Sequence, residues 1–380
     1  MNHDHDLFTP NQVSNEWLEQ FLVPSLIAGN SYKIDTTTTP VKLDQNENPW
    51  DWPEKIKDKI ITELRNRPWN RYPSAYSDDL ADLVGSQSGL TGGCVLLGPG
   101  SNYLVALVIS TFSRVGRGKV VVARPSFALY ESHCAYDGIP FDPWPLDANM
   151  QYDTSLLPEL TPGSMVVFAS PNNPVGNVLP YKNLEHLAAL HPDVLFVADE
   201  AYLEYSREPY TPLLKDHSNI LLIRTFSKTL GAAGVRIGYV LGAPKLIEQL
   251  RKLRLPYMIN LFGLVAARLV LEDHETQKHF KGIVAKGIAE RERVYESLKS
   301  QKSQKSTTPG KGLQVIPSEA NFLLLKWPDQ AACASAYRHI LAQGILIRDV
   351  SKSPGLAGCL RVTIGTADQN NLFLAAVQGI

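Results

Sequence analysis

Six short apolar runs, each ending in polar or aromatic residues, constrain the fold of this 380-residue chain most strongly. Runs such as Val-Val-Val-Ala and Leu-Phe-Val-Ala lack polar alternation, which is typical of strands covered on both faces. Helical segments separate the runs, so the pattern predicts an α/β fold whose mostly parallel, helix-covered sheet extends from about residue 45 to 270. The predicted strands are Val95–Leu97, Val120–Ala123, Met165–Ala169, Val194–Ala198, Ile220–Ile223 and Ile237–Leu241.

A smaller α+β unit is predicted after this sheet. Residues 275 to 300 carry apolar side chains near helical spacing, and we expect one long helix that leads into the second unit. Four further apolar runs surround a helical segment at 329–343. We therefore divide the chain into an N-terminal arm at 1–42, a large domain at 43–274 and a small C-terminal domain at 275–380, and expect one amphipathic helix within residues 15–27 of the arm.

Composition excludes several classes of protein. A net charge of −1 gives no basic footprint for nucleic acid. No apolar run is long enough to span a bilayer, and the first residues are acidic where a signal peptide would be basic. The four cysteines lack Cys-x-x-Cys spacing and fit free thiols better than a disulfide frame or a metal site. We expect a cytoplasmic protein without nucleic-acid, membrane or metal partners.

The residues after the fifth predicted strand carry the strongest chemical signal. Thr225 and Ser227 flank Lys228, and Arg236 follows eight residues after the lysine. A lysine that forms a Schiff base needs an uncharged amine, while hydroxyls and a guanidinium suit a phosphate. Together they suggest a phosphorylated aldehyde, and pyridoxal phosphate (PLP) is such a molecule. The stretch alone is equally compatible with a solvated surface lysine.

Other strand ends supply the remaining groups that PLP chemistry requires. A glycine-rich turn before Ser101 and Asn102 joins a strand to a helix, an arrangement that directs backbone N–H groups at a phosphate. Asp199, Asn173 and Tyr202 each have an ordinary structural explanation as turn, loop or core residues. Together, however, they offer an acid for a ring nitrogen and two groups for a ring hydroxyl. The ends of parallel strands share one edge, so these groups are expected to converge.

The ordered motifs resemble those of the fold type I, class II aminotransferases, and within them the histidinol-phosphate aminotransferases. The matching motifs, between residues 43 and 366, are Asn-Glu-Asn-Pro, Arg-Tyr-Pro, Gly-Ser-Asn, Pro-Ser-Phe, Asn-Asn-Pro-Val-Gly, Asp-Glu-Ala-Tyr, Thr-Phe-Ser-Lys and Leu-Arg-Val-Thr-Ile-Gly. The resemblance implies that Lys228 is the Schiff-base lysine, with Asp199 and Tyr202 also catalytic. It implies further cofactor contacts from Ser101, Asn102, Phe127, Asn173, Thr225, Ser227 and Arg236.

The resemblance also implies partners and a substrate. Tyr72 is expected to reach the phosphate of a neighbouring subunit, which requires a homodimer with shared sites. Arg361 matches an arginine that binds the carboxylate of glutamate, and Arg348 matches a second arginine typical of the histidinol-phosphate branch. Asn46, Glu47, Asn48 and Tyr257 are expected to close the pocket on the imidazole side. The implied reaction moves an amino group from L-histidinol phosphate to 2-oxoglutarate in histidine biosynthesis.

Three departures from the family pattern keep other substrates open. Tyr103 replaces an acid, Phe127 a frequent tyrosine and Met258 a frequent asparagine. The alternatives are an aromatic amino-acid aminotransferase and an O-phosphothreonine decarboxylase of the same fold. A ligand-sensing regulator would need a DNA-binding domain ahead of the fold, and we expect the first 40 or so residues not to supply one.

Overall fold

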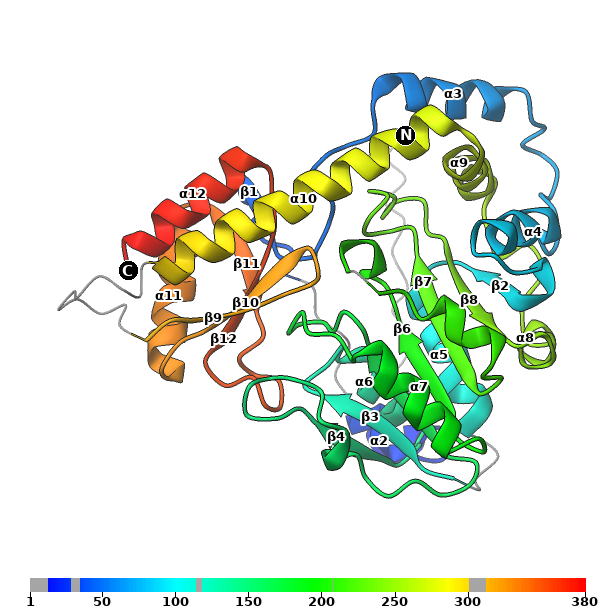
Figure 1. Ribbon diagram of the computed structural model, residues 1–380, viewed down its shortest axis with the longest axis horizontal. Helices are drawn as coiled ribbons and strands as arrows, with labels where there is room; N and C mark the ends of the chain where they lie inside the picture. Colours follow the sequence, from blue (N-terminus) through cyan, green and yellow to red (C-terminus); the bar gives the residue numbers. More distant parts are fainter. Residues whose placement is uncertain (1–12, 29–34, 114–117, 207, 301–311) are drawn as a thin grey trace, which may run out of the picture.

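The chain forms two sheets, each with its own helices, joined by the long helix α10 (His274–Ser300) (Figure 1). The computed structural model describes residues 13–28, 35–113, 118–206, 208–300 and 312–380. Within these ranges no helix is both long and apolar enough to cross a membrane. The same ranges hold no cluster of side chains suited to a metal ion, and all four cysteines are free thiols.

The larger sheet has seven strands in the order β2-β8-β7-β6-β5-β3-β4, and only β8 runs antiparallel to its neighbours. This confirms the predicted mostly parallel sheet. The strands are β2 (Val95–Gly98), β3 (Val120–Arg124), β4 (Phe141–Pro145), β5 (Met165–Ala169), β6 (Leu195–Asp199), β7 (Ile220–Thr225) and β8 (Gly238–Gly242). The sequence did not indicate β4, because two prolines interrupt its pattern, and such a strand is tolerated only at an edge.

Both faces of this sheet are covered by helices, as its apolar strands require. Consecutive residues of β7 alternate between the two layers: Ile220 and Leu222 pack on one face, and Leu221 and Ile223 on the other. The first layer contains α3 (Glu54–Arg65), α4 (Asp78–Gln87), α7 (Tyr181–Leu190) and α9 (Leu261–Glu272). The second contains α5 (Ser101–Ser113), α6 (Leu129–Tyr136) and α8 (Pro244–Arg251).

The smaller sheet has five strands in the order β1-β11-β12-β10-β9 and packs against α10, α11 (Gln330–Ala342) and α12 (Ala367–Gln378). Its strands are β1 (Val41–Leu43), β9 (Gln314–Ile316), β10 (Phe322–Lys326), β11 (Ile345–Asp349) and β12 (Cys359–Thr363). The sequence division placed residues 41–43 at the junction of arm and large domain, but β1 pairs in parallel with β11. The chain therefore passes through the small-domain sheet before it enters the large domain.

The N-terminal arm contains two short helices instead of the single one expected. They are α1 (Asn15–Leu18) and α2 (Pro24–Ala28), and neither buries a side chain. The ring of Pro24 cannot continue a helix from the preceding turn. The arm lies against the large domain, where the Ser25 hydroxyl donates to the carbonyl of Ala135 in α6. Residues 1–12 and 29–34 of the predicted arm lie outside the described residues.

Candidate active site

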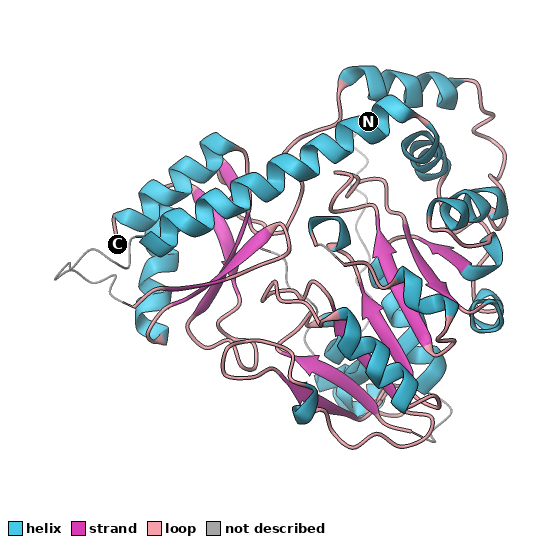
Figure 2. Cartoon of the chain, in the orientation of Figure 1, coloured by secondary structure: helices cyan, strands magenta, loops and turns pink. Residues whose placement is uncertain are grey.

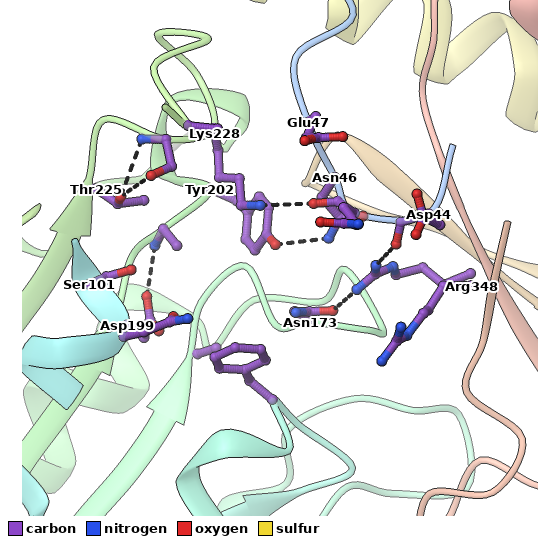
Figure 3. A pocket seen from close by; sticks show the side chains of 18 of the residues that line it. Asp44, Asn46, Glu47, Ser101, Asn173, Asp199, Tyr202, Thr225, Lys228 and Arg348 are labelled. Atoms are coloured by element: carbon purple, nitrogen blue, oxygen red, sulfur yellow. Dashed lines mark hydrogen bonds between the residues drawn. The ribbon is translucent and has the colours of Figure 1, made fainter. Parts of the chain in front are cut away.

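A cavity of about 300 Å³ lies where the carboxyl-terminal ends of the large-sheet strands meet the small domain. Loops from both units surround it (Figure 2), and side chains far apart in sequence converge there (Figure 3). Residues 44–48, which we call the strap, run along one side after β1, and four of them line the cavity. The predicted site residues that line it are Ser101, Asn102, Phe127, Asn173, Asp199, Tyr202, Thr225, Ser227, Lys228, Arg236, Arg348 and Arg361.

One end of the cavity forms a cup suited to a phosphate group. Ser101 and Asn102 begin α5, whose first turn has no acidic residue, so backbone N–H groups and the positive helix end face the cavity. The Arg236 guanidinium lies 3.3 Å from the hydroxyl of Ser227. Gly100 has a φ of +94°, and a Cβ there would lie 2.6 Å from Nη2 of Arg236. The backbone can therefore approach the arginine so closely only because residue 100 is glycine.

A buried carboxyl group lies beyond the cup, at the end of β6. Asp199 is 6% exposed, and it accepts hydrogen bonds from the Tyr130 hydroxyl at 2.7 Å and from the amide of Ala201 at 3.0 Å. Burial raises the pKa of Asp199 to about 6, and the Tyr130 hydrogen bond opposes that rise. A basic ring nitrogen placed opposite would share a proton with such a group. The ring of Phe127, which lines the same cavity, packs edge-on against Tyr130 at 5.6 Å.

Tyr130 is a functional residue that the sequence did not reveal. It follows Phe127 by three residues, and this spacing brings both rings to one side of the start of α6. That spacing is the signal that was available, but the sequence alone does not show that the phenol reaches a strand end 69 residues away.

Lys228 lies in the centre of the cavity, in the loop that follows β7 (Figure 3). Burial lowers the pKa of its amine to about 8, and the cationic side chains of Arg361 and Arg236 contribute. Its Nζ donates a hydrogen bond of 2.9 Å to the carbonyl of Gln45 in the strap. An appreciable fraction of this amine is therefore neutral near pH 7, as attack on an aldehyde requires.

Tyr202 and Asn173 line the same cavity as the lysine. The side-chain amide of Asn46 donates to the Tyr202 oxygen at 2.8 Å. Asn173 follows β5, and its Oδ1 accepts a hydrogen bond from Arg361. An amide and a phenol thus line the cavity, where a ring hydroxyl could meet them.

The other end of the cavity is formed by Arg348 and Arg361. Residue 348 on β11 and residue 361 on β12 are paired directly across the antiparallel ladder. Arg361 also donates to the carbonyl of Asp44 in the strap. Like charges placed opposite each other destabilise a sheet, so the pair indicates a site for an anion.

Three predicted residues do not line this cavity. The amide of Asn48 donates to the carbonyl of Thr229 at 3.0 Å and its Oδ1 accepts from the amide of Trp50, which argues against the expected substrate contact. Tyr72 is 79% exposed and stacks on Tyr257 at a centroid distance of 4.3 Å, on the outer surface of the large domain. The family departures Tyr103 and Met258 lie outside the lining as well.

The residues present fit pyridoxal phosphate: a cup for its phosphate, a buried acid for its ring nitrogen and a lysine of lowered pKa for its aldehyde. The fold and the site thus define a PLP-dependent transferase of fold type I. Residues 38–377 match the family model for aminotransferases of class I and II, and the chain belongs to that family.

A histidinol-phosphate aminotransferase from Chlorobium luteolum is 32% identical over 94% of this chain and 97% of its own. Two solved structures share the fold. A histidinol-phosphate aminotransferase from Sinorhizobium meliloti, in complex with pyridoxal-5'-phosphate, superposes with a TM-score of 0.77 at 23% identity, over 94% of this chain and 98% of its own. An L-threonine-O-3-phosphate decarboxylase from Porphyromonas gingivalis gives a TM-score of 0.73 at 21% identity, over 89% of this chain and 98% of its own. The fold alone therefore does not separate the two activities.

Proposed function

We propose that this aminotransferase moves the amino group of L-histidinol phosphate to 2-oxoglutarate, giving imidazole-acetol phosphate and L-glutamate, as a cytoplasmic step of histidine biosynthesis. The observation that carries the proposal is the cross-strand pair of Arg348 and Arg361. A phosphate monoester carries nearly two negative charges at neutral pH, and two guanidiniums match that charge better than one.

Ser101 of the cup and Arg348 lie on opposite sides of the cavity, with Lys228 between them (Figure 3), and Arg236 and Arg361 also line it. Arg236 and the start of α5 serve the phosphate of the cofactor, and the arginine pair serves the phosphate of the substrate. A substrate held at both its amino group and its phosphate has a fixed orientation, which brings the reacting carbon to the lysine. An unphosphorylated aromatic amino acid leaves the buried Arg361 and the partly buried Arg348 with only one carboxylate, and this disfavours it.

Within this site, each side chain has a defined task. When bound, PLP withdraws electrons from the substrate carbon that bears the amino group and carries that group between substrates. Lys228 Nζ is placed to remove the proton from that carbon and would deliver it to the carbon on the other side of the amino nitrogen. Asp199 keeps a proton on the ring nitrogen, and Asn173 and Tyr202 hold the ring oxygen. For the second substrate, Arg361 binds a carboxylate of 2-oxoglutarate.

We also infer that the protein works as a homodimer. A surface on the large domain gathers exposed aromatic and apolar side chains, among them Trp69, Tyr72, Leu255 and Tyr257. The loop holding Tyr257 is tied to the loop holding Tyr72, since the amide of Tyr257 donates to the carbonyl of Ala75 at 2.9 Å. Exposed aromatic clusters of this kind mark interfaces. Analytical ultracentrifugation should give twice the chain mass at micromolar concentration, and a monomer with full activity would refute the inference.

A substrate panel tests the proposed reaction directly. Purified holoenzyme is assayed with 2-oxoglutarate and L-histidinol phosphate or L-phenylalanine, and separately with O-phosphothreonine for release of carbon dioxide. We expect kcat/KM for L-histidinol phosphate to exceed that for L-phenylalanine by at least about a hundredfold, the discrimination typical of a site with dedicated charged partners. Preference for phenylalanine, or decarboxylation as the fastest reaction, would overturn the assignment in favour of one of the two alternatives.

A further inference from the structure

Two neighbouring strap residues contact two of the side chains that surround the cofactor site. The carbonyl of Gln45 accepts the hydrogen bond from Lys228 Nζ at 2.9 Å, and the side-chain amide of Asn46 reaches the oxygen of Tyr202 at 2.8 Å. The strap comes from the small-domain strand β1, whereas Lys228 and Tyr202 belong to the large domain. The resemblance placed Asn46, with Glu47 and Asn48, on the imidazole side of the pocket, and implied no contact between Asn46 and Tyr202.

The hydrogen-bond partners of the Asn46 side chain define the orientation of its amide group. The backbone N–H of Asn46 donates to Thr363 Oγ1 at 2.9 Å, and the same hydroxyl lies 3.2 Å from Asn46 Oδ1. The Thr363 hydroxyl accepts from the backbone and donates its own hydrogen to Oδ1 of Asn46. The amide oxygen therefore lies on Thr363, and the NH₂ group faces Tyr202.

This orientation determines what Tyr202 can do. An amide NH₂ group is only a donor, so the phenol oxygen of Tyr202 accepts the bond from Asn46. The phenol hydrogen must then go to a different acceptor, and Tyr202 lines the cavity that fits the cofactor. With an acceptor in place of the amide NH₂, the phenol hydrogen would be drawn to residue 46 instead.

The site is built rigidly around Asn46, which is completely buried. Its φ of +54° lies in the left-handed region, which asparagine tolerates better than most residues. Its carbonyl accepts from the side chain of Asn321 at 3.0 Å. Thr363 lies two residues after Arg361 on β12, so both point to the same face of the strand, toward the strap.

We propose that Asn46 is a positioning residue that makes Tyr202 a hydrogen-bond donor to the ring oxygen of the cofactor. It acts through the phenol of Tyr202 and is held in register by Thr363. The inference rests on the cofactor of the proposed function but not on its substrate. Asparagine is thus needed at residue 46 for two reasons, the left-handed backbone and the donor amide.

The test is a pH titration of the visible absorbance of the holoenzyme, without any substrate. A hydrogen bond donated to the ring oxygen stabilises the deprotonated form of the linkage between Lys228 and the cofactor, because that oxygen then carries more negative charge. In Asn46→Asp the carboxylate accepts the phenol hydrogen, so the titration midpoint should rise by about one pH unit, the size expected for one lost hydrogen bond. Tyr202→Phe should raise the midpoint similarly.

The double variant separates hydrogen-bond direction from simple charge. If Asn46 acts through the phenol, Asn46→Asp should move the midpoint by less than half as much in the Tyr202→Phe background as in the wild type. A shift of half or more in that background would mean that the new charge acts directly, and would overturn the proposal. An unchanged midpoint in Asn46→Asp alone would overturn it as well.

A second variant covers the case in which Asn46→Asp does not fold. Thr363→Val keeps the side-chain shape but removes the hydroxyl that fixes the amide oxygen, so both amide orientations become populated. A smaller rise of the midpoint is expected, and only when Tyr202 is present; no rise, or an equal rise without Tyr202, would contradict the proposal. Absence of a visible band in the wild-type protein would instead refute the cofactor assignment itself.

Discussion

Arg348 and Arg361 face each other across the β11–β12 ladder, and both line the cavity that contains Lys228. Two guanidiniums in register on adjacent strands repel each other unless an anion lies between them. The small domain thus presents a site for a strongly charged group at a fixed distance from the reacting lysine. We propose that this pair, on the sheet that forms one wall of the cavity, determines the choice of substrate.

Removing one of these arginines should weaken binding of the phosphorylated substrate selectively. In Arg348→Ala we expect KM for L-histidinol phosphate to rise by about ten- to a hundredfold, as for loss of a charge-assisted hydrogen bond. KM for L-phenylalanine should change by less than about threefold. Steady-state kinetics with both substrates measures this, and Lys352→Ala, which removes an exposed cation from the same domain, serves as the control. Equal losses for both substrates would contradict a phosphate site.

The ionised side chain of Asp199 should lower the free energy of unfolding of the cofactor-free protein at neutral pH. Its folded pKa of about 6 lies above the ordinary value of 3.8, so the folded state binds this proton more tightly than the unfolded state does. The resulting stabilisation is complete below about pH 4 and is lost as the pH rises through 6. The free energy of unfolding of cofactor-free Asp199→Asn should therefore exceed that of the cofactor-free wild type at pH 7.5 by up to about 3 kcal/mol. Turnover of the Asp199→Asn holoenzyme should fall by at least about a hundredfold.

Urea unfolding of both cofactor-free proteins at pH 5 and pH 7.5 measures the difference. The advantage of Asp199→Asn should shrink at pH 5, where part of the wild-type Asp199 is protonated. If the variant is the less stable protein at pH 7.5, the carboxyl group is not the buried, destabilising group described above.

Tyr130 should matter for turnover more than for folding. In Tyr130→Phe, Asp199 loses the hydrogen bond that opposes the effect of burial, so the pKa of Asp199 rises further. The carboxylate then competes more strongly with the ring nitrogen of the cofactor for the proton. We expect kcat to fall about tenfold. Tyr152→Phe is the matched control, because Tyr152 is also buried and donates one hydrogen bond, to the carbonyl of Ala169. Similar losses of kcat in both variants would mean that Tyr130 contributes only to packing, which would contradict the prediction.

The cup should be sensitive to a single methyl group. In Gly100→Ala the new Cβ must displace Arg236, and the φ of +94° adds strain, so the dissociation constant for PLP should rise at least about tenfold. Gly234→Ala is the control: its Cβ would meet no atom within 4 Å, and its φ lies outside the positive range. Fluorescence titration of both cofactor-free variants with PLP measures the effect. Unchanged affinity in Gly100→Ala would exclude this cup as the phosphate site.

The cofactor half of the site could be predicted from the sequence, because its residues directly follow buried strands. The parallel topology brings Asp199 and Lys228 to the same edge once β6 and β7 are recognised. Local patterns and the family resemblance together indicated these residues, but neither indicated Tyr130.

Long-range pairing was not predictable in this way. The strap crosses to residues 317 positions away, where Asn46 meets Thr363, and no local periodicity indicates such a contact. The Asn-Glu-Asn motif indicated that the strap closes the pocket, but not which of its residues do so: Asn46 and Glu47 line the cavity, whereas Asn48 does not. β1 was missed for a related reason, since a strand of three residues carries too little pattern.

The most direct test of the central claim is the absorbance spectrum of the purified holoenzyme before and after addition of L-histidinol phosphate, with no keto acid present. The visible band of the cofactor bound to Lys228 should convert to the near-ultraviolet band of the aminated cofactor, and the Lys228→Ala protein should lack the starting band. A visible band that L-histidinol phosphate leaves unchanged, but that L-phenylalanine converts, would contradict the proposed substrate.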